Sequence, residues 1–570
     1  MAFVALLLPS VVQSQVDYDI LKKATNKIFI KDVIIHDRPG SSIEYGSILI
    51  DDGIIQQIGK GIAEPKDALI LKADSLHVYP AFIDALSHTG VKNKEENEKR
   101  PNVKFAGSPP NVVAGILPQL SVVDQLESDA KSISSLREAG FGLAHVAPDG
   151  RMLPGQSAII STSGKALKDI VLKERVGLYS QLKSSPGVYP ATMIGVISKF
   201  KELYRQAEGA SVHIGKYKSS PLGMQRPNYD EAIIAMIPVT KKQQQVFYKA
   251  KSAKDVYRVL ALQKELGFDL VLSDVQQVYP IVDAIKSSNA KVLISLDLPE
   301  KPEGMKDEEN DKAEDEEKED SEDKDKDKDE KEPEVEDDEE TKKFKERKIA
   351  AYKNYVAQGS MLEEAGVPFS FSWIEAKPKD LQKNIQTLIE NGMSEKTAIS
   401  ALTTNPAQLL GISNIAGTAE KGKLGNLMIS TKAIFEKDAK IKFMLVDGEL
   451  FEYEIKEKKK NSSSGEQMDI AGKYSYEISQ FSANGELTIE KDGDEIKVLM
   501  SDEEDLSDTI EATNVSQDGS NLSFDLAVTE GGNTMDISVS IEFSEEDFEG
   551  TVVTQFGAAE IEGTKKSPKH

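Results

Sequence analysis

The chain has 570 residues, far more than one hydrophobic core supports, so it contains several compact domains rather than a single small module. With 39% hydrophobic and 29% charged residues, it has enough apolar material for folded domains and too little for a polytopic membrane protein. The formal net charge is -26, and the absence of cysteine excludes disulfides, thiolate metal sites and cysteine nucleophiles.

An apolar run, residues 2–12, has the length of the central region of a signal peptide and is too short to span a bilayer. Small or polar residues follow it. Residues 1–16 are therefore predicted to be a signal peptide that leaves an exported, periplasmic or secreted protein without a transmembrane segment. The alternative is a buried N-terminal strand, because no Lys or Arg precedes the run.

Short β-rich runs fill residues 27–78. Residues 28–35 indicate one strand, and residues 47–50 are expected to pair with residues 54–58. The turn between them is Asp52-Gly53, a dipeptide that tolerates the positive φ angles of a tight hairpin. Strand-like runs return at residues 427–454, after a long region of a different kind.

From about residue 80 to residue 373, apolar strand-like runs alternate with helical patterns. Strands are expected at residues 142–146, 158–161, 270–272 and 292–296, and a helix at residues 253–266. Such alternation indicates an α/β fold with a parallel sheet and crossover helices. The length of the region fits a closed barrel.

Most of the negative charge lies in one segment inside this region. Residues 300–341 contain 25 Asp plus Glu and 8 Lys, a net charge of -17, which leaves -9 for the rest of the chain. With almost no apolar side chains, the segment is predicted to be a disordered acidic insertion on the surface, and it lacks the regular spacing of a calcium-binding loop. Nucleic acid binding is disfavoured, because no clustered Lys/Arg surface is expected.

Residues 456–468 have the composition of a flexible linker, and residues 469–566 form a separate all-β domain in this interpretation. Runs of alternating polarity there are separated by turn signals such as Asp492-Gly493 and Asp518-Gly519. The pattern predicts a small antiparallel β-barrel or sandwich without a metal or catalytic constellation.

Four stretches in serial order carry a resemblance to a known family. They are GSILIDDGIIQQIG, VYPAFIDALSHTG, REAGFGLAHVAPDGRMLPGQSAIIST and ALTTNPAQLLGISNIAGTAEKGKLGNLMI. They resemble the amidohydrolase superfamily, specifically its imidazolonepropionase-like, exported bacterial branch. The resemblance implies a (β/α)8 TIM-like barrel at residues 79–426, interrupted by the acidic insertion. It also implies a β-sandwich domain built from residues 17–78 and 427–455.

The resemblance implies a metal site as well. That superfamily binds one or two divalent metals, such as zinc, at the carboxyl ends of the barrel strands. Its ligands are a His-x-His pair, a Lys or Glu, two further histidines and an aspartate, and the metal lowers the pKa of a bound water. In this chain Leu86 stands at the first histidine of the pair and only His88 remains. A leucine has no donor atom for a metal.

The other metal positions also depart from the family pattern. Lys249 stands at the fifth-strand histidine, and its ammonium group repels a dication. At the sixth strand Ser273 and Asp274 are available, of which only Asp274 is a plausible ligand. At the eighth strand Ile374 replaces the aspartate, with Glu375 beside it. Most donors of the first metal are therefore missing.

The small number of histidines limits any metal site, however the chain is aligned with the family. The six are His36, His77, His88, His145, His213 and His570. His145 is expected to be a hydrogen-bonded structural residue, and His213 is expected to lie in a Gly/Ser-rich loop. A residual site would at most combine His88, the only surviving family ligand, with carboxylates such as Asp84.

Asp274 and Glu375 are the catalytic candidates, and Gln156 and Ser157 are candidate ligand contacts near the expected barrel mouth. Three functions stay open. The first is a catalytically impaired pseudoenzyme that binds a small-molecule ligand or a partner and needs no cofactor. The second is an active hydrolase of non-peptide carbon-nitrogen bonds with a rebuilt site, and the third is a structural subunit for an active amidohydrolase paralogue. The missing donors favour the first and the third.

Overall fold

The computed structural model describes residues 26–92, 103–299, 301–302, 305, 339–453, 455, 469–478, 483–492, 495–502, 509–530, 533–544, 547–554 and 557–566. The chain divides into two compact units, Met1–Ile455 and Lys456–His570. The expected signal peptide, most of the acidic insertion and the 456–468 linker lie outside the described residues. Within the described ranges, no helix is both long and apolar enough to cross a membrane.

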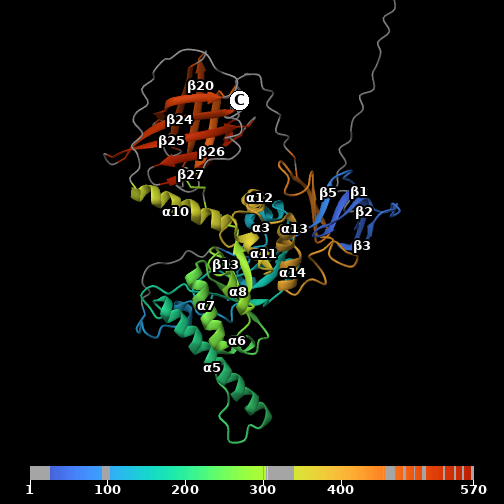
Figure 1. Ribbon diagram of the computed structural model, residues 1–570, viewed down its shortest axis with the longest axis vertical. Coiled ribbons are helices and arrows are strands. Elements are labelled where there is room, and N and C mark those ends of the chain that lie inside the picture. Colours follow the sequence, from blue (N-terminus) through green and yellow to red (C-terminus); the bar gives the residue numbers. More distant parts are fainter. Residues whose placement is uncertain are drawn as a thin grey trace, which may run out of the picture. The chain divides into compact units, whose positions relative to one another are not determined.

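Eight strands from the two ends of the first unit form one mixed sheet, part of which is the blue region of Figure 1. The strands are β1 (Lys27–Arg38), β2 (Ser41–Asp51), β3 (Ile54–Gly59), β4 (Leu69–Lys72), β5 (His77–Pro80), β16 (Leu427–Ser430), β17 (Ile441–Val446) and β18 (Glu449–Glu452). Their order is β18-β17-β16-β5-β1-β2-β3, and β4 pairs with β1 off this path. Where the sequence analysis expects a sandwich, all strands share one hydrogen-bonded sheet.

The β2–β3 hairpin turns at the expected dipeptide. Asp52 has a φ of 48° and Gly53 a φ of 74°, both in the left-handed region that a tight turn of this kind requires. A second irregularity lies at Asp32, where a φ of 52° separates the part of β1 that pairs with β4 from the part that pairs with β5. Two short strands, β4 and β5, therefore share one edge of β1, and β2 pairs along the other edge.

The barrel has eight strand positions, seven parallel and one antiparallel. Its strands are β6 (Phe82–Ser87), β7 (Phe141–Val146), β8 (Gly155–Gln156) with β9 (Ala158–Ser161), β11 (Gly177–Gln181), β12 (Gln245–Lys249), β13 (Leu270–Val275), β14 (Lys291–Ser295) and β15 (Phe369–Ser372). Residues 155–161 fill the gap between β7 and β11 and run antiparallel to both. The barrel closes where the Trp373 N–H donates to the Leu86 carbonyl at 2.9 Å.

Helices follow most of the strands. They are α2 (Asn111–Ala114), α3 (Lys131–Glu138), α4 (Leu167–Ile170), α5 (Met193–Ser219), α6 (Glu231–Thr240), α7 (Ala253–Leu266), α8 (Val282–Ser288), α10 (Glu339–Val356), α11 (Gln358–Glu364), α12 (Leu381–Glu390), α13 (Glu395–Leu402) and α14 (Thr404–Leu409). Short elements η1 (Val122–Gln125), η2 (Pro378–Asp380) and β10 (Val171–Lys173) complete the unit. The placement of His213 in a loop is wrong, because α5 continues through Gly209 and Gly215 to Ser219.

The second unit is a nearly closed antiparallel barrel. Its strands are β19 (Gly472–Ile478), β20 (Ala483–Asp492), β21 (Glu495–Asp502), β22 (Thr509–Glu511), β23 (Thr513–Asp518), β24 (Asn521–Glu530), β25 (Asn533–Phe543), β26 (Asp547–Thr554) and β27 (Gly557–Lys565). The order is β22-β21-β20-β19-β27-β26-β25-β24-β23, so the two end strands are neighbours in the chain, separated by Ala512 alone. Alternate side chains such as Leu487, Phe524 and Ile541 form its apolar core.

Candidate functional site

The candidate site lies at the carboxyl ends of the parallel strands. Lys249 is the last residue of β12, Asp274 is near the end of β13, and Glu375 follows β15 by three residues. His88 follows β6 directly. In barrels of this kind the carboxyl ends meet at one edge, which is where side chains from distant parts of the sequence converge.

Lys249 is the centre of an ion-pair network. Its Nζ lies 2.8 Å from Oε1 of Glu375 and 3.5 Å from Oδ2 of Asp274. The ammonium group of Lys251 contacts the other carboxylate oxygen of Glu375. The side chain of Lys249 is 17% exposed and that of Glu375 is 31% exposed, so the network is only partly screened by water. The structure thus brings both catalytic candidates to one lysine.

Burial and charge act in opposite directions on the Glu375 carboxyl group. Burial alone raises its pKa, but hydrogen bonds from Lys249 and Lys251 outweigh that effect, and the pKa lies below its ordinary value. Glu375 is therefore ionised at neutral pH, with each oxygen bound by an ammonium group. A carboxylate in this state has little capacity left for a further cation.

Asp274 is in a different environment although it faces the same lysine. Burial raises the pKa of its carboxyl group, against the attraction of Lys249, which lowers it. The side chain is fully buried, and neither carboxylate oxygen makes a hydrogen bond of normal geometry with a described residue, although nearby Ser295 and Lys249 both favour the ionised form. The backbone has a φ of 58°, an unusual conformation for a residue other than glycine. The fold thus keeps at the mouth a buried carboxyl group that is only weakly compensated by its polar neighbours.

His88 presents a neutral imidazole. Its Nδ1 donates a hydrogen bond to the carbonyl oxygen of Ala147 at 2.8 Å, so the lone pair is on Nε2. Burial lowers the pKa of the ring, which the bond to Ala147 opposes. Nε2 lies 4.0 Å from Oδ1 of Asp149, too far for a hydrogen bond. The ring meets Tyr179 edge to face, with centroids 5.6 Å apart.

The residues at the barrel mouth do not fit a divalent metal. Leu86 is fully buried and offers no donor side chain, and its carbonyl accepts the bond that closes the barrel. Lys249 brings a positive charge to within 3.5 Å of both carboxylates that could bind a dication. In the part of the chain that the structure describes, no group of three or more His, Asp or Glu side chains could hold a metal ion.

Tyr179 and Lys251 belong to the site although the sequence analysis does not name them. The Tyr179 hydroxyl is buried and has no hydrogen-bond partner within the described ranges. Burial and the nearby carboxylates of Asp274, Asp149 and Glu375 raise its pKa well above the ordinary value. Lys251 could have been found from its spacing, because it lies two residues after Lys249 and such residues share one side of an extended chain. No comparable signal marks Tyr179.

Gln156 and Ser157 both hydrogen-bond to other parts of the protein. Gln156 Nε2 donates to the carbonyl of Pro118 at 2.8 Å, and its Oε1 accepts from Gln244 at 3.2 Å. Ser157 Oγ lies 2.7 Å from Nε2 of His145. Both candidate side chains are buried, and their role as ligand contacts stays a prediction.

His145 joins three strand positions of the barrel. Its Nδ1 donates to the carbonyl of Ala85 in β6 at 2.7 Å, and its Nε2 accepts from the hydroxyl of Ser157 between β8 and β9. The Gly177 N–H at the start of β11 in turn donates to the same hydroxyl at 3.1 Å. Burial lowers the pKa of the imidazole to about 4, so the ring is neutral and structural, as the sequence analysis expects.

Asp84 is buried below the mouth in β6. Its Oδ1 accepts a hydrogen bond from the Leu86 N–H at 2.9 Å, and its Oδ2 has no partner in the described structure. Burial raises the pKa of this carboxyl group to about 7. The structure does not bring Asp84 into contact with His88 in any hydrogen bond or ion pair of the described residues.

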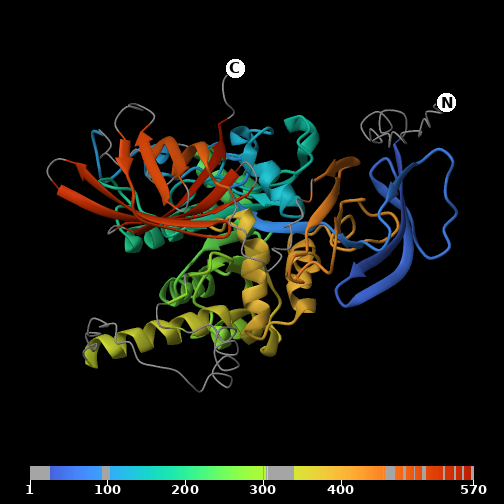
Figure 2. The same ribbon diagram turned by 90° about the horizontal axis from the view of Figure 1, so that it is seen from above.

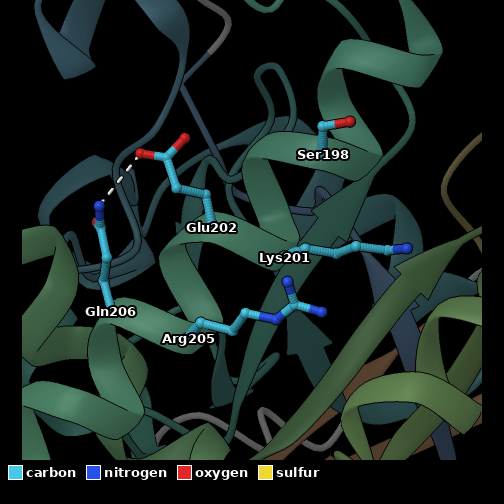
Figure 3. Close-up of a pocket in the computed structure, with 5 residues that line it drawn as sticks. All are labelled: Ser198, Lys201, Glu202, Arg205 and Gln206. Carbon is cyan, nitrogen blue, oxygen red and sulfur yellow. Dashed lines mark hydrogen bonds between the residues drawn. The ribbon is translucent and has the colours of Figure 1, made fainter.

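A surface hollow of about 580 Å³ lies along one face of α5 and is not part of this site (Figure 3). It is lined by Ser198, Lys201, Glu202, Arg205 and Gln206. Lys201 and Arg205 both pair with Glu265 of α7, and Gln206 donates to Glu202 at 3.2 Å. These polar groups are engaged with one another on an exposed helix surface, an arrangement typical of a solvated face.

Solved structures show a related fold. An amidohydrolase from Thermotoga maritima MSB8 matches with a TM-score of 0.58 and 17% sequence identity, over 75% of this chain and 100% of that chain. Phenylurea hydrolase B superposes more loosely, with a TM-score of 0.43 and 13% identity over 75% of this chain and 96% of that chain. So does a prolidase complexed with N-methylphosphonate-L-proline (TM-score 0.41, 12% identity, 75% and 100%).

No protein-family model matches the chain, and no curated protein is significantly similar to it in sequence. At 17% identity, the match to the Thermotoga protein shows that the two chains share a fold. A shared fold does not by itself carry a shared activity, which depends on the residues at the site.

Proposed function

We propose that this chain is a member of the amidohydrolase superfamily whose barrel mouth binds a small ligand or a partner instead of a catalytic metal. The observation that carries this proposal is the position of Lys249, whose Nζ lies 2.8 Å from Glu375 and 3.5 Å from Asp274. The ammonium group supplies the positive charge that two carboxylates in a partly buried site need. The shared fold with the Thermotoga amidohydrolase supports the family assignment.

Asp274 and Tyr179 support the ligand-binding part of the proposal. Each has a buried polar group without a hydrogen-bond partner in the described ranges. An unsatisfied buried polar group destabilises a protein, so groups of this kind are usually met by water or a ligand. A carboxylate acceptor beside a phenol favours a ligand with N–H donors, such as an amine, an amide or a urea.

The test is the metal content of the purified protein by elemental analysis, paired with a screen for hydrolysis of amides and cyclic amides. We expect no stoichiometric zinc and no activity above that of the His88→Ala variant. One tightly bound zinc per wild-type chain, with activity lost in His88→Ala, would overturn the proposal.

A gain-of-binding variant tests the same idea from the opposite direction. The triple substitution Leu86→His, Lys249→His and Ile374→Asp restores three donors at the family's metal positions and should create zinc affinity. The matched control is Lys249→Gln alone, which removes the cation without adding an imidazole. Equal zinc binding by both variants would show that the added donors are irrelevant.

An active hydrolase with a rebuilt, metal-independent site is the second candidate. The observation in its favour is Asp274, which combines an unusual backbone conformation, complete burial and a raised pKa. Such properties concentrate at catalytic acids and bases. If this reading is correct, the substrate screen finds an activity that Asp274→Asn abolishes and His88→Ala retains.

Export remains a proposal that rests on the apolar run at residues 2–12. The mass of the mature protein, isolated from cells that express the full chain, tests it directly. A signal peptide predicts a mature N-terminus near residue 17 in the exported fraction. An uncleaved chain that stays with the cytoplasmic fraction would contradict export.

A further inference from the structure

α10 presents a strongly basic surface beside the barrel. Residues 341–353 contain six Lys or Arg and one Glu, a net charge of +5. The exposed residues include Lys342, Lys343, Phe344, Lys345, Arg347 and Lys348. α10 extends as one long helix away from the barrel (Figure 1, Figure 2). The expectation that the chain has no clustered Lys/Arg surface is therefore wrong. The basic run is short and directly follows a segment with a net charge of -17, so the net charge of the region hides it.

The acidic segment 306–338 is connected to both ends of α10. At its C-terminal end it leads directly into the first residue of the helix, Glu339. Its N-terminal end lies nine residues after Asp297, whose carbonyl accepts a hydrogen bond of 3.0 Å from the hydroxyl of Tyr355 in the last turn of α10. An 18-residue helix is about 27 Å long, whereas 33 extended residues reach about 110 Å. The segment is thus long enough to run back along the whole helix.

We propose that the acidic segment 306–338 binds the basic surface of α10, residues 341–353, in the same chain. The segment contains 21 Asp plus Glu and 7 Lys, a net charge of -14, opposite in sign to the helix. Its connection to both helix ends gives an effective concentration in about the millimolar range, so ion pairs that are individually weak can hold it. The positive end of the helix dipole lies at Glu339, where the segment arrives, and adds to the attraction.

This association gives the acidic segment a function. The basic surface of α10 would attract nucleic acid or an anionic lipid membrane. A bound acidic segment competes with such ligands for the same Lys and Arg side chains. The chain's own acidic segment occupies this surface, so binding of other anions is weak and requires displacement of the segment.

The chain contains no cysteine, so two introduced cysteines can carry fluorescent dyes without background labelling. We place them at Ser321→Cys in the acidic segment and Ala350→Cys on the exposed side of α10. Energy transfer is measured in the full chain from about 10 mM to about 1 M salt, over which the Debye length falls from about 30 Å to about 3 Å. We expect efficient transfer at low salt and a clear decrease at high salt.

Removal of charge from α10 distinguishes two causes of energy transfer. One is binding of the acidic segment to α10, and the other is compaction of the segment without such binding. The helix variant is Lys342→Gln, Arg347→Gln and Lys348→Gln, which keeps residues that favour helix. The matched control is Lys216→Gln, Lys218→Gln and Lys286→Gln, which removes the same charge from other exposed positions. We expect the helix variant to show the high-salt transfer efficiency already at low salt, and the control to behave as wild type. Equal efficiencies in wild type and the helix variant would overturn the proposal.

A variant of the acidic segment tests the same ion pairs without any substitution in α10, so a loss of helical structure in α10 cannot explain its effect. Asp325→Asn, Asp327→Asn and Asp329→Asn leave α10 untouched and should also lower the transfer efficiency at low salt. In a second measurement, a double-stranded oligonucleotide or vesicles of anionic lipid are added to the labelled wild type. If either binds α10 tightly without lowering the transfer efficiency, the acidic segment does not occupy this surface and the proposal is rejected.

Discussion

Asp274 and Glu375 face the same lysine, yet the pKa of Asp274 is raised and that of Glu375 is lowered. Asp274 has lost its contact with water, and the attraction of Lys249, 3.5 Å away, does not make up for that loss. Glu375 keeps partial exposure and receives two ammonium groups. The two carboxyl groups should therefore contribute to stability with opposite signs at neutral pH.

Substitution of Asp274 by Asn should stabilise the protein. A carboxyl group with a raised pKa contributes stability at acidic pH, and this contribution is lost as the pH rises through the folded-state pKa. We expect Asp274→Asn to increase the free energy of unfolding by about 1 kcal/mol at pH 7 and by much less near pH 4. Urea denaturation at both pH values measures this. The exposed Asp149→Asn serves as control and should change stability by less than about 0.5 kcal/mol.

Substitution of Glu375 by Gln should have the opposite effect. Its lowered pKa means that the carboxylate stabilises the folded state above the unfolded-state pKa, and that this contribution is lost as the pH falls through the folded-state pKa. Because the side chain is partly exposed, we expect a loss of about 0.5 kcal/mol at pH 7 and almost none near pH 3. The loss should shrink in about 1 M salt. An unchanged loss at high salt would show that packing, not charge, is responsible.

Sequence reasoning identified Lys249, Asp274 and Glu375, because a resemblance assigns each a position at the end of a barrel strand. It could not show that they form one network, since Lys249 and Glu375 are 126 residues apart in the sequence. It also missed Tyr179, whose importance comes from burial beside three carboxylates. Contacts of this kind depend on closure of the barrel and leave no local pattern.

At the scale of elements, the antiparallel segment between β7 and β11 depends on the hydrogen bonds of His145. Replacing Ser157 by Ala removes the donor to His145 Nε2 and leaves a buried acceptor unsatisfied. We expect Ser157→Ala to lower the free energy of unfolding by about 2 kcal/mol, measured by urea denaturation at pH 7. Ser219→Ala, at an exposed position of α5, is the control and should have little effect.

The lowered pKa of His145 indicates how the stability of the barrel should depend on acidic pH. The pKa of about 4 lies below the ordinary histidine value, so the contribution of His145 to stability is present above about pH 6.5 and is lost as the pH falls toward 4. His36 behaves in the same way, because burial lowers its pKa to about 4 as well. We expect the free energy of unfolding to fall over this pH range. The fall should be smaller in His36→Gln, because the amide side chain of glutamine does not take up a proton in this pH range.

The acidic segment should be dispensable for folding of the barrel. We expect deletion of residues 302–340 to leave the melting temperature within a few degrees of wild type, because the segment has almost no apolar side chains to bury. The bridge that replaces it must span about 27 Å, the length of α10, so about 15 Gly/Ser residues are needed. A large loss of stability with this bridge would show that the segment packs against the barrel.

Local signals explain which elements could be predicted. The helix expected at residues 253–266 is α7, which begins after Ser252, whose hydroxyl accepts from the Asp255 N–H, and ends at Gly267 with a φ of 79°. The β2–β3 turn is set in the same way by its own two residues. In contrast, the antiparallel direction of residues 155–161 is decided by their neighbours β7 and β11, and no feature of the sequence indicates it.

At the scale of the whole molecule, the chain consists of two units, each with a core of its own. All nine strands of the second unit lie within residues 472–565, and its buried core residues lie between Ile470 and Ile561. None of the described core residues of the barrel or of its β domain comes from beyond residue 455. Each unit thus has the apolar material that independent folding requires.

We therefore expect a fragment of residues 469–566 to fold alone. It should unfold cooperatively in urea, with a slope of about 1 kcal/mol per molar urea, because about 100 residues bury a limited surface. The complementary fragment, residues 1–455, should keep the unfolding midpoint that the larger unit has in the intact chain, since no core residue is lost. Near-ultraviolet circular dichroism of the intact chain and of both fragments measures this independence. If the spectra of the two fragments do not add up to that of the intact chain, or if either fragment unfolds without a cooperative transition, the two units stabilise each other and must be treated as one folding unit.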